Sequence, residues 1–338
     1  MSNWLQHAWY RGSGWLVLLR PLSSLFNFLA QRRRKQQQSQ AVKLSCPVVI
    51  VGNISVGGSG KTPLLLALIE LCQRHGLRVG VVSRGYGGKA HDYPLTVDSH
   101  TDPSLCGDEP AMIARRTGIP LIVDPDRVRA AQRLLQLHRV DLILSDDGLQ
   151  HYRLDRQLEI AVVDADRGFG NGRTLPEGPL RELPSRLSEV DFVVLNGDGN
   201  FSYPGALNYK LKPTALRHIR TGRLIEPSPK ALGVEEVSAI AGIGHPQRFF
   251  DTLRDLGFSV VSKALPDHAV IDAGVLEPFD GKTLLMTEKD AVKCEAIASD
   301  KCWSLCVNAL LDTAAEQRLC TALLSLIEPH QSGDINGS

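Results

Sequence analysis

Six consecutive residues, Gly57-Gly58-Ser59-Gly60-Lys61-Thr62, have the composition of a loop that binds phosphate groups. Glycines let the backbone turn tightly and aim amide N–H groups at phosphate oxygens, and a helix that starts there adds a partial positive charge. Lys61 would reach the β- and γ-phosphates of a nucleoside triphosphate, and the Thr62 hydroxyl would bind magnesium. The segment therefore predicts a site for a nucleotide with Mg²⁺.

The loop departs from the general phosphate-loop pattern at one position. Ser55 stands where the pattern G-x-x-x-x-G-K-[ST] has its first glycine. Pro63 supports the prediction all the same, because proline is tolerated in the first turn of a helix. We expect the nucleotide to bind along the whole segment from Ser55 and Val56 to Thr62, and the departure indicates a specialised branch of the class.

A carboxylate after a neighbouring strand would complete the magnesium site. Asp146 follows the apolar run Leu142-Ile143-Leu144-Ser145 and is the candidate ligand, with Asp147 beside it. In phosphate-loop proteins a carboxylate at this place holds the metal directly or through water. The alternative is that Asp146-Asp147-Gly148 is only a turn.

The elements that must position these residues follow from an alternation of β-branched runs and helical periods after Pro47. Continuous apolar strands in such an alternation predict an α/β fold, a P-loop NTPase-like parallel sheet with helices on both faces. We expect strands at 47–51, 79–83, 121–123, 142–144, 160–163 and 192–195, and helices at 64–75, 110–117 and 127–138.

A rise in Gly, Asn, Asp and Pro content between Gly197 and Pro204 marks a domain boundary. We expect a nucleotide-binding domain over residues 36–204, a smaller C-terminal α/β domain over 205–330, and disorder over 331–338. In the smaller domain, strands are expected at 207–211, 237–241, 259–261, 283–286 and 303–307, and a helix at 246–256.

Residues 1–35 differ in character from the rest of the chain. Trp15 to Ala30 is largely apolar and is followed by Arg32-Arg33-Arg34-Lys35. The pair Arg20-Pro21 interrupts the run, whereas a spanning helix needs about 20 apolar residues, so we expect a membrane-anchoring helix that lies at the surface or inserts marginally. The basic cluster would keep the following body on the cytoplasmic side. The alternative is a helix that packs on its own domain. Gln36 to Gln40 is expected to be a polar linker.

Charge and cysteine content exclude other classes of protein. Lys and Arg number 38 against 37 for Asp and Glu, so no basic field favours nucleic-acid binding. The seven cysteines form no C-x-x-C pair, and their irregular spacing suits neither a disulfide framework nor a zinc site. They are expected to be reduced thiols in a cytosolic body, with Cys294, Cys302 and Cys306 in the core.

Eight segments, in this order along the chain, make the prediction specific. They are Val51 to Pro63, Ser83 to Gly87, Gly107 to Pro110, Ser145 to His151, Gly178 to Glu182, Gly242-Ile243-Gly244, Pro266-Asp267-His268 and Met286 to Lys293. Together they closely resemble the tetraacyldisaccharide 4′-kinase family of lipid A biosynthesis. The resemblance covers nearly the whole chain, including the N-terminal apolar helix, and Ser55 is then the family's own form of the loop.

The resemblance implies transfer of the γ-phosphoryl group of ATP to the 4′-hydroxyl of tetraacyldisaccharide 1-phosphate, giving lipid IVA. The enzyme would work at the inner membrane with its active site facing the cytoplasm. A base must accept the hydroxyl proton. The resemblance points to Asp108 and His268 acting together, with Lys61 at the phosphates, and leaves open which of the two takes the proton. From the residues alone, Asp108 could cap a helix and His268 could be a surface loop residue.

The resemblance also suggests residues around the reacting groups. Glu109 is a candidate for the magnesium shell, although an exposed acid in a helix's first turn is the alternative. Arginine suits phosphate because its planar fork donates two hydrogen bonds, and residues just past a strand's carboxyl end often bind ligands. Each candidate could instead be an ordinary surface residue. The candidates for binding substrate or phosphate are Asn53, Arg84, Tyr86, Arg127, Asp147, Gln150, His151 and Arg181.

Two other functions compete with this reading. One is a nucleotide switch protein, because Thr287-Glu288-Lys289-Asp290 is similar to the guanine-reading N/T-K-x-D. Its lysine is one place off, however, and Val56 stands where partitioning ATPases carry a lysine before the double glycine. The other is a kinase for a soluble small molecule, which leaves the N-terminal helix unexplained.

Overall fold

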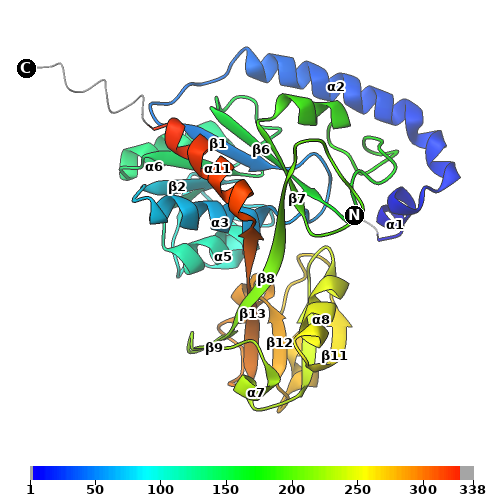
Figure 1. The fold of residues 1–338 in the computed structure, drawn as a ribbon, viewed down its shortest axis with the longest axis vertical. Coiled ribbons are helices and arrows are strands. Elements are labelled where there is room, and N and C mark those ends of the chain that lie inside the picture. Colours follow the sequence, from blue (N-terminus) through cyan, green and yellow to red (C-terminus); the bar gives the residue numbers. More distant parts are fainter. Residues whose placement is uncertain (1–2, 328–338) are drawn as a thin grey trace, which may run out of the picture. The chain divides into compact units, whose positions relative to one another are not determined.

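Parallel strands joined by helical crossovers build both of the units that the chain forms. The computed structural model describes residues 3–327. Within them, the first unit comprises residues 3–84, 119–210 and 310–327, and the second comprises 85–118 and 211–309. Figure 1 shows the elements of both units.

The sheet of the first unit has the strand order β7-β6-β1-β5-β2-β4, with parallel pairing throughout. Strand β1 is buried along its whole length, as expected for a strand covered on both faces. All six strands were predicted to within two residues at either end. Their bounds are β1 (Val48–Gly52), β2 (Val79–Ser83), β4 (Leu121–Val123), β5 (Leu142–Asp146), β6 (Leu158–Asp164) and β7 (Phe192–Asn196).

Besides the N-terminal helices, α3, α6 and α11 belong to the first unit. Helix α3 (Lys61–Arg74) contacts β1, β2 and β5, whereas α6 (Arg127–Leu137) contacts β2 and β4. Helix α3 begins at Lys61, three residues before its expected start, so the lysine of the phosphate loop opens the helix. Helix α11 (Thr313–Ser325) packs on α3 and was not predicted, although its buried residues Ala315, Leu319 and Leu323 follow the helical period.

The second unit has its own parallel sheet, in the order β11-β10-β12-β13. Successive residues of β10 point to opposite faces of the sheet and belong to two different hydrophobic cores. Ala239 packs with α8, and Ile240 packs with α9 and α10. Helices therefore cover both faces of this sheet. The bounds are β10 (Glu236–Ala241), β11 (Ser259–Ala264), β12 (Leu284–Thr287), β13 (Cys302–Leu311), α5 (Asp108–Thr117), α8 (Pro246–Asp255), α9 (Ala273–Leu276) and α10 (Glu288–Cys294).

The compact units differ from the domains expected at 36–204 and 205–330. Residues 85–118 belong to the second unit, and residues 310–327 return to the first. A change in composition along the sequence cannot reveal a chain that leaves a unit and comes back, so the domain limits stay a prediction.

Residues 328–338, including the segment expected to be disordered, lie outside the described residues. The remaining elements are β3 (Leu95–Val97), α4 (Pro103–Cys106), η2 (Pro184–Glu189), β8 (Leu207–His218), β9 (Leu224–Ile225), α7 (Pro229–Leu232) and η3 (Glu277–Phe279).

The N-terminal segment is broken into three helical pieces: α1 (Asn3–Arg11), η1 (Gly14–Leu19) and α2 (Arg20–Gln38). Pro21 lies in the first turn of α2, where its missing N–H costs no hydrogen bond. The linker expected at Gln36 to Gln40 was wrong for its first three residues, because α2 continues to Gln38. Unbranched Lys, Arg and Gln side chains favour helix. In the described part of the chain, no helix is both long and apolar enough to cross a membrane.

One side of this segment packs on the first unit. Trp9 is only 1% exposed, and its Nε1–H donates to the Pro176 carbonyl at 3.0 Å. The buried Ser23 hydroxyl donates to the Thr174 carbonyl at 3.0 Å and accepts from the Glu177 N–H at 2.9 Å. The helical segment is thus docked on its own unit, as the alternative reading expected.

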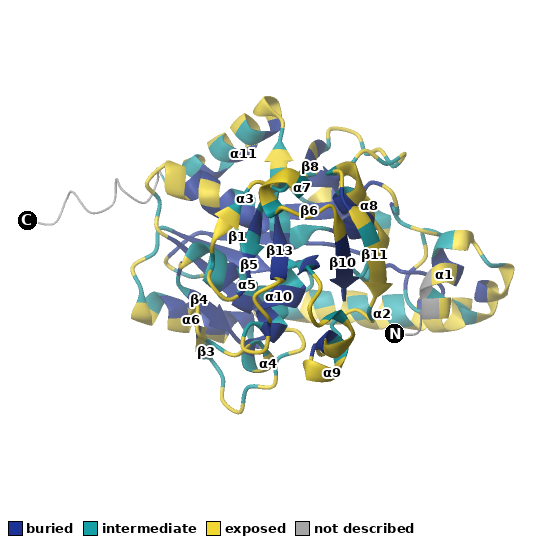
Figure 2. Cartoon of the chain, turned by 90° about the horizontal axis from the view of Figure 1, so that it is seen from below, coloured by how far each residue is buried: buried dark blue, intermediate teal, exposed yellow. Residues whose placement is uncertain are grey.

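The other side of the segment carries large apolar side chains in contact with solvent. Figure 2 shows that α2 is exposed over most of its length. A monomeric protein in water rarely leaves so many neighbouring apolar groups uncovered. The exposed large apolar residues are Trp4, Trp15, Val17, Leu18, Leu22, Leu25, Phe28 and Leu29.

We predict that Trp9→Ala loosens the N-terminal segment, because removing a buried tryptophan costs about 3–5 kcal/mol of packing. Limited trypsin digestion should then cleave between Arg11 and Lys35 at least about tenfold faster. Trp4→Ala is the control, since Trp4 is 62% exposed. Equal cleavage rates for the two variants would show that Trp9 does not hold the segment.

Candidate active site

The loop between β1 and α3 depends on glycine at position 60. Gly60 has φ of 87°, a conformation that L side chains rarely adopt. A Cβ atom added there would lie 2.3 Å from both the Asn196 Nδ2 and the Tyr209 hydroxyl oxygen. Both contacts are far inside normal van der Waals separation, so no other residue fits without displacing them.

Asn196 and Tyr209 are loop-holding residues that the sequence analysis missed. The Asn196 Nδ2 donates to the Ser59 carbonyl at 3.2 Å, and the Tyr209 hydroxyl donates to the Gly60 carbonyl at 2.5 Å. Both side chains thus fix carbonyls of the phosphate loop. The position of Asn196, a polar residue at the end of an apolar strand, could have indicated a role at the site. No sequence pattern indicates such a role for Tyr209.

Lys61 points toward two oxygen acceptors of the same unit. Its Nζ lies 3.2 Å from the Asn53 Oδ1 and 3.4 Å from the Asp147 Oδ1. Burial disfavours the charged form of Asp147, but the positive charges of Lys61 and Arg181 outweigh it and lower the pKa of this carboxyl below its usual range. Asp147 is therefore ionised at neutral pH.

Arg181 and Gln150 complete this cluster. The Arg181 Nη1 lies 3.0 Å and 3.2 Å from the two Asp147 carboxylate oxygens and 3.4 Å from the Gln150 Oε1. The Gln150 Nε2 donates to the Asn53 carbonyl at 3.1 Å and to Glu182 Oε1 at 2.7 Å. The structure thus brings four of the predicted substrate-binding residues together around Lys61, from segments that lie far apart in sequence.

Asp146 and Thr62 supply the oxygen donors that magnesium prefers. Parallel pairing of β1 with β5 aligns Val51 with Asp146, so this carboxylate lies beside the strand that leads into the phosphate loop. The Ser83 hydroxyl donates to Asp146 Oδ2 at 3.2 Å. Magnesium bound to a nucleotide commonly uses only one or two protein carboxylates, and one carboxylate with one hydroxyl fits that pattern. Among residues 3–327 there is no cluster of three or more His, Cys, Asp or Glu side chains that could hold a metal.

Arg127 and His151 are directed toward backbone carbonyls. The buried Arg127 guanidinium donates to the carbonyls of Asp124 and Asp146, at 3.0 Å and 3.4 Å. Burial lowers its pKa to about 10, so it keeps its charge at neutral pH. The His151 Nε2 lies 2.9 Å from the Pro125 carbonyl, and burial lowers the pKa of this ring. The side chain of Arg84, unlike the buried Arg127, is exposed to solvent.

In the second unit, Asp108 and His268 form a direct pair. The His268 Nδ1 lies 3.1 Å from the Asp108 Oδ2. Burial opposes the charge on Asp108, but the hydrogen bond from His268 and the nearby Lys293 lower its pKa. The alternative that Asp108 caps a helix is wrong, because Gly107 occupies the N-cap position of α5 and no side chain caps it.

Two further contacts fix His268. Its backbone has φ of 60°, in the left-handed region, and its N–H donates to the Gly242 carbonyl at 3.2 Å. The Tyr86 ring meets the imidazole edge on, with centroids 5.1 Å apart. Tyr86, predicted as a substrate residue, thus lies beside the pair. Glu109 forms an ion pair with Lys289 at 3.2 Å, and its place in a magnesium shell stays a prediction.

The predicted burial of Cys294, Cys302 and Cys306 is confirmed. All seven cysteines are free, and Cys294, Cys302 and Cys306 are buried. Burial raises the pKa of Cys294 and of Cys306 to about 12, so both thiols stay protonated at neutral pH. These cysteines are core residues.

We predict that Gly60→Ala weakens ATP binding at least about tenfold, because the added methyl group forces Asn196 and Tyr209 off the loop. Isothermal titration calorimetry would measure the change. Gly58→Ala is the matched control, since a Cβ at Gly58 meets no atom within 4 Å, and its loss should be smaller. A smaller loss for Gly60→Ala than for Gly58→Ala would contradict this account of the loop.

A glycine loop between β1 and α3, with an acidic residue at the end of the adjacent strand β5, is typical of P-loop nucleotide-binding α/β proteins. Comparison with known proteins narrows this class. Residues 15–326 match the family model described as tetraacyldisaccharide-1-P 4′-kinase, and the chain belongs to this family.

Relatives and a solved structure agree with the match. The chain is 48% identical to the tetraacyldisaccharide 4′-kinase of Alcanivorax borkumensis over 92% of this chain and 94% of the relative. It is also 48% identical to that of Pseudomonas fluorescens, over 97% and 98% of the two chains. The crystal structure of LpxK from Aquifex aeolicus in complex with ATP superposes with a TM-score of 0.78 at 27% identity, covering 92% of this chain and 99% of that one. The resemblance inferred from the sequence and the mixed α/β fold are both confirmed.

Proposed function

We propose that this protein transfers the γ-phosphoryl group of ATP to the 4′-hydroxyl of tetraacyldisaccharide 1-phosphate and so forms lipid IVA in lipid A biosynthesis. The observation that carries the proposal is family membership over residues 15–326, with a phosphate loop at the expected strand–helix junction. Relatives that share 48% of the sequence over nearly the full length are named for this reaction. This favours the kinase over a nucleotide switch protein and over a kinase for a soluble small molecule.

The first unit would bind the donor. Backbone amides of Ser55 to Gly60 would bind phosphate oxygens, and Lys61 would exchange its present acceptors for the β- and γ-phosphates. Thr62 and Asp146 would hold Mg²⁺, which supplies positive charge to the phosphate oxygens when it is bound. Because Asp147 pairs with Lys61 and Arg181 here, it keeps the two cations close to the loop.

The second unit would supply the base for the acceptor hydroxyl. Asp108 is ionised at neutral pH, and His268 is held against it by the Gly242 carbonyl and the Tyr86 ring. A carboxylate and an imidazole in contact orient each other and can accept a proton as a pair. Asn53, Gln150 and Arg181 are proposed to bind substrate or phosphate, since they cluster with Lys61. Arg84, Arg127, His151 and Tyr86 are proposed for the same role.

We predict that purified protein given γ-labelled ATP, Mg²⁺ and the tetraacyl disaccharide 1-phosphate in detergent transfers label to the lipid. Lys61→Ala and Asp108→Asn should each lower the rate at least about 100-fold, because one removes phosphate charge stabilisation and the other the proton acceptor. Lys43→Ala and Asp280→Asn are the controls, since both side chains are exposed. Label that appears only as free phosphate would exclude the kinase proposal.

The exposed apolar side of the N-terminal segment would bind the membrane that carries the lipid substrate. No helix of the described residues is suited to cross a bilayer, so the proposal is a surface contact at the cytoplasmic face of the inner membrane. Basic residues at 32–35 follow the apolar residues directly and would add attraction to anionic lipid. Docking of the opposite side through Trp9 and Ser23 would keep the enzyme body at that surface.

We predict that the triple variant Leu22→Asn, Leu25→Asn, Phe28→Asn partitions at least about tenfold less onto phosphatidylglycerol-containing vesicles, because each large apolar group contributes about 1.5–3 kcal/mol on burial. Sedimentation with vesicles measures the effect. The double variant Leu224→Asn, Val270→Asn is the control, since both residues are exposed outside this segment. If the triple variant sediments like the wild type while still binding ATP, another surface holds the protein on the membrane.

A further inference from the structure

Helix α10 directs two lysines, one turn apart, at the Asp108–His268 pair. The Lys289 Nζ lies 3.4 Å from the His268 Nε2 and 3.2 Å from the Glu109 Oε1. The Lys293 Nζ lies 3.4 Å from the Asp108 Oδ2. Residues four apart on a helix share a face, so the two ammonium groups reach the two members of the pair.

The contact between Lys289 and His268 determines where the imidazole carries its proton. An ammonium group has three N–H donors and no acceptor, so the His268 Nε2 must be the acceptor in this contact. The Nδ1 then carries the hydrogen and donates it to the Asp108 carboxylate, which can only accept. In this arrangement each of the two contacts joins a donor to an acceptor.

We propose that Lys289 is a positioning residue that holds His268 as the neutral imidazole protonated at Nδ1 and so maintains its hydrogen bond to Asp108. If Nε2 carried the hydrogen instead, the Nδ1 lone pair would face the Asp108 carboxylate, and two acceptors 3.1 Å apart repel each other. Lys289 thus acts on the reaction through His268. The inference rests on the proposed function only for its effect on catalysis.

Among the described residues, the Asp267 carboxylate also lies near the ring and would favour a different state. Its Oδ1 lies 3.8 Å from the His268 Nε2, and a carboxylate there would favour a proton on that nitrogen. Lys289 is closer, at 3.4 Å, and its side chain is 16% exposed against 41% for Asp267, so water screens the carboxylate more. The other groups that face the pair are the neutral Tyr86 ring, the Glu109 carboxylate bound to Lys289, and Lys293.

Buried polar bonds hold α10 firmly enough for Lys289 to do this. The fully buried Asp290 carboxylate accepts from the Gly242 N–H at 3.0 Å, from the Thr287 hydroxyl at 2.7 Å and from Lys293 at 3.0 Å. Gly242 is the residue whose carbonyl binds the His268 N–H. The strand end that holds His268 is therefore tied directly to the helix that carries Lys289.

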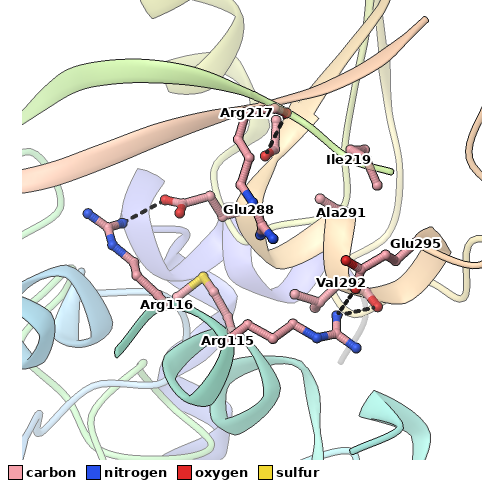
Figure 3. Close-up of a pocket in the computed structure, with 10 residues that line it drawn as sticks. Arg115, Arg116, Arg217, Ile219, Glu288, Ala291, Val292 and Glu295 are labelled. Carbon is pink, nitrogen blue, oxygen red and sulfur yellow. Dashed lines mark hydrogen bonds and ion pairs between the residues drawn. The ribbon is translucent and has the colours of Figure 1, made fainter. Parts of the chain in front are cut away.

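Ion pairs also join α10 to the helix of Asp108. Figure 3 shows Arg116 of α5 paired with Glu288, and Arg115 paired with Glu295, at 2.8 Å and 3.1 Å. These side chains line a cavity of about 20 Å³, room for about one water molecule, and the two ion pairs form a brace between the helices. The brace sets the register of Lys289 and Lys293 against Asp108.

The test is a direct observation of the imidazole. The full chain, labelled with ¹⁵N-histidine, would give long-range ¹H–¹⁵N spectra of its ten histidines without substrate, and His268→Asn would assign the signal of position 268. We expect Nδ1 with the shift of a protonated nitrogen and Nε2 with that of an unprotonated one at neutral pH. A ring protonated at Nε2 alone, or at both nitrogens, would overturn the proposal in the wild type itself.

Two variants test the part played by Lys289. Lys289→Met, which keeps the length of the side chain without its donors, should let Nε2 gain a hydrogen and so remove the pattern of a protonated Nδ1 with an unprotonated Nε2, and Lys289→Arg should retain that pattern. Lys282→Met, at an exposed position of the same unit, is the control. A Lys289→Met protein that folds and keeps the wild-type pattern would overturn the proposal.

The kinetic readout separates this inference from the proposed function. Loss of a group that orients a reacting residue commonly costs 10–100-fold, so kcat of Lys289→Met should fall about 10–100-fold with the KM for ATP unchanged. The Lys289→Arg variant should keep most of the wild-type kcat. The spectra need no lipid substrate, so a failed kinase assay would not change the conclusion about the tautomer. A different tautomer, in turn, would not contradict the proposed kinase activity.

Discussion

The hydrogen-bonded pairing of β1 with β5 is the constraint on which the donor half depends. Parallel strands bring their carboxyl ends to the same edge of a sheet, so the register that aligns Val51 with Asp146 also sets the start of the phosphate loop beside two consecutive carboxylates. At that edge, Asp146 accepts a hydrogen bond from the Ser83 hydroxyl, while Asp147 turns to Lys61 and Arg181. A shift of the pairing by one residue would reverse the faces of the two aspartates.

In the second unit, the constraint on which the other contacts depend is a buried carboxylate. Asp290 has no exposed surface, and its charge is compensated by a backbone N–H, a hydroxyl and an ammonium group. An uncompensated buried charge would be strongly destabilising, so these partners must all be in place when the unit folds. Their placement also fixes the loop of His268 and the helix of the two lysines. The stability of the unit and the geometry of the Asp108–His268 pair therefore depend on the same bonds.

Local patterns in the sequence sufficed for much of the fold and for the phosphate loop. The strands of the first sheet are continuous apolar runs, and the glycines with Lys61 and Thr62 form a compact motif. Non-local contacts could not be found in this way. Tyr209 holds Gly60 across 149 residues, and no local pattern marks it. In the sequence, Lys289 stands within a family segment and a partial guanine-reading motif, and neither indicates its contact with His268, which exists only after β12 and the loop at 266–268 come together. The polar composition of Gln36 to Gln40 predicts a linker, whereas helix-favouring Arg, Lys and Gln side chains continue α2 to Gln38.

The left-handed backbone at Asp147 and His268 bears on how the two positions can change. They are the non-glycine residues with positive φ among residues 3–327, at 50° and 60°. A β-branched residue at either place would pay about 1–2 kcal/mol in backbone strain before any chemistry was lost. Asparagine adopts this conformation more readily than most residues. The backbone conformation therefore limits which residues can replace Asp147 and His268, whatever their side chains do. A substitution by asparagine, which adopts this conformation, would test the role of the side chain without adding backbone strain.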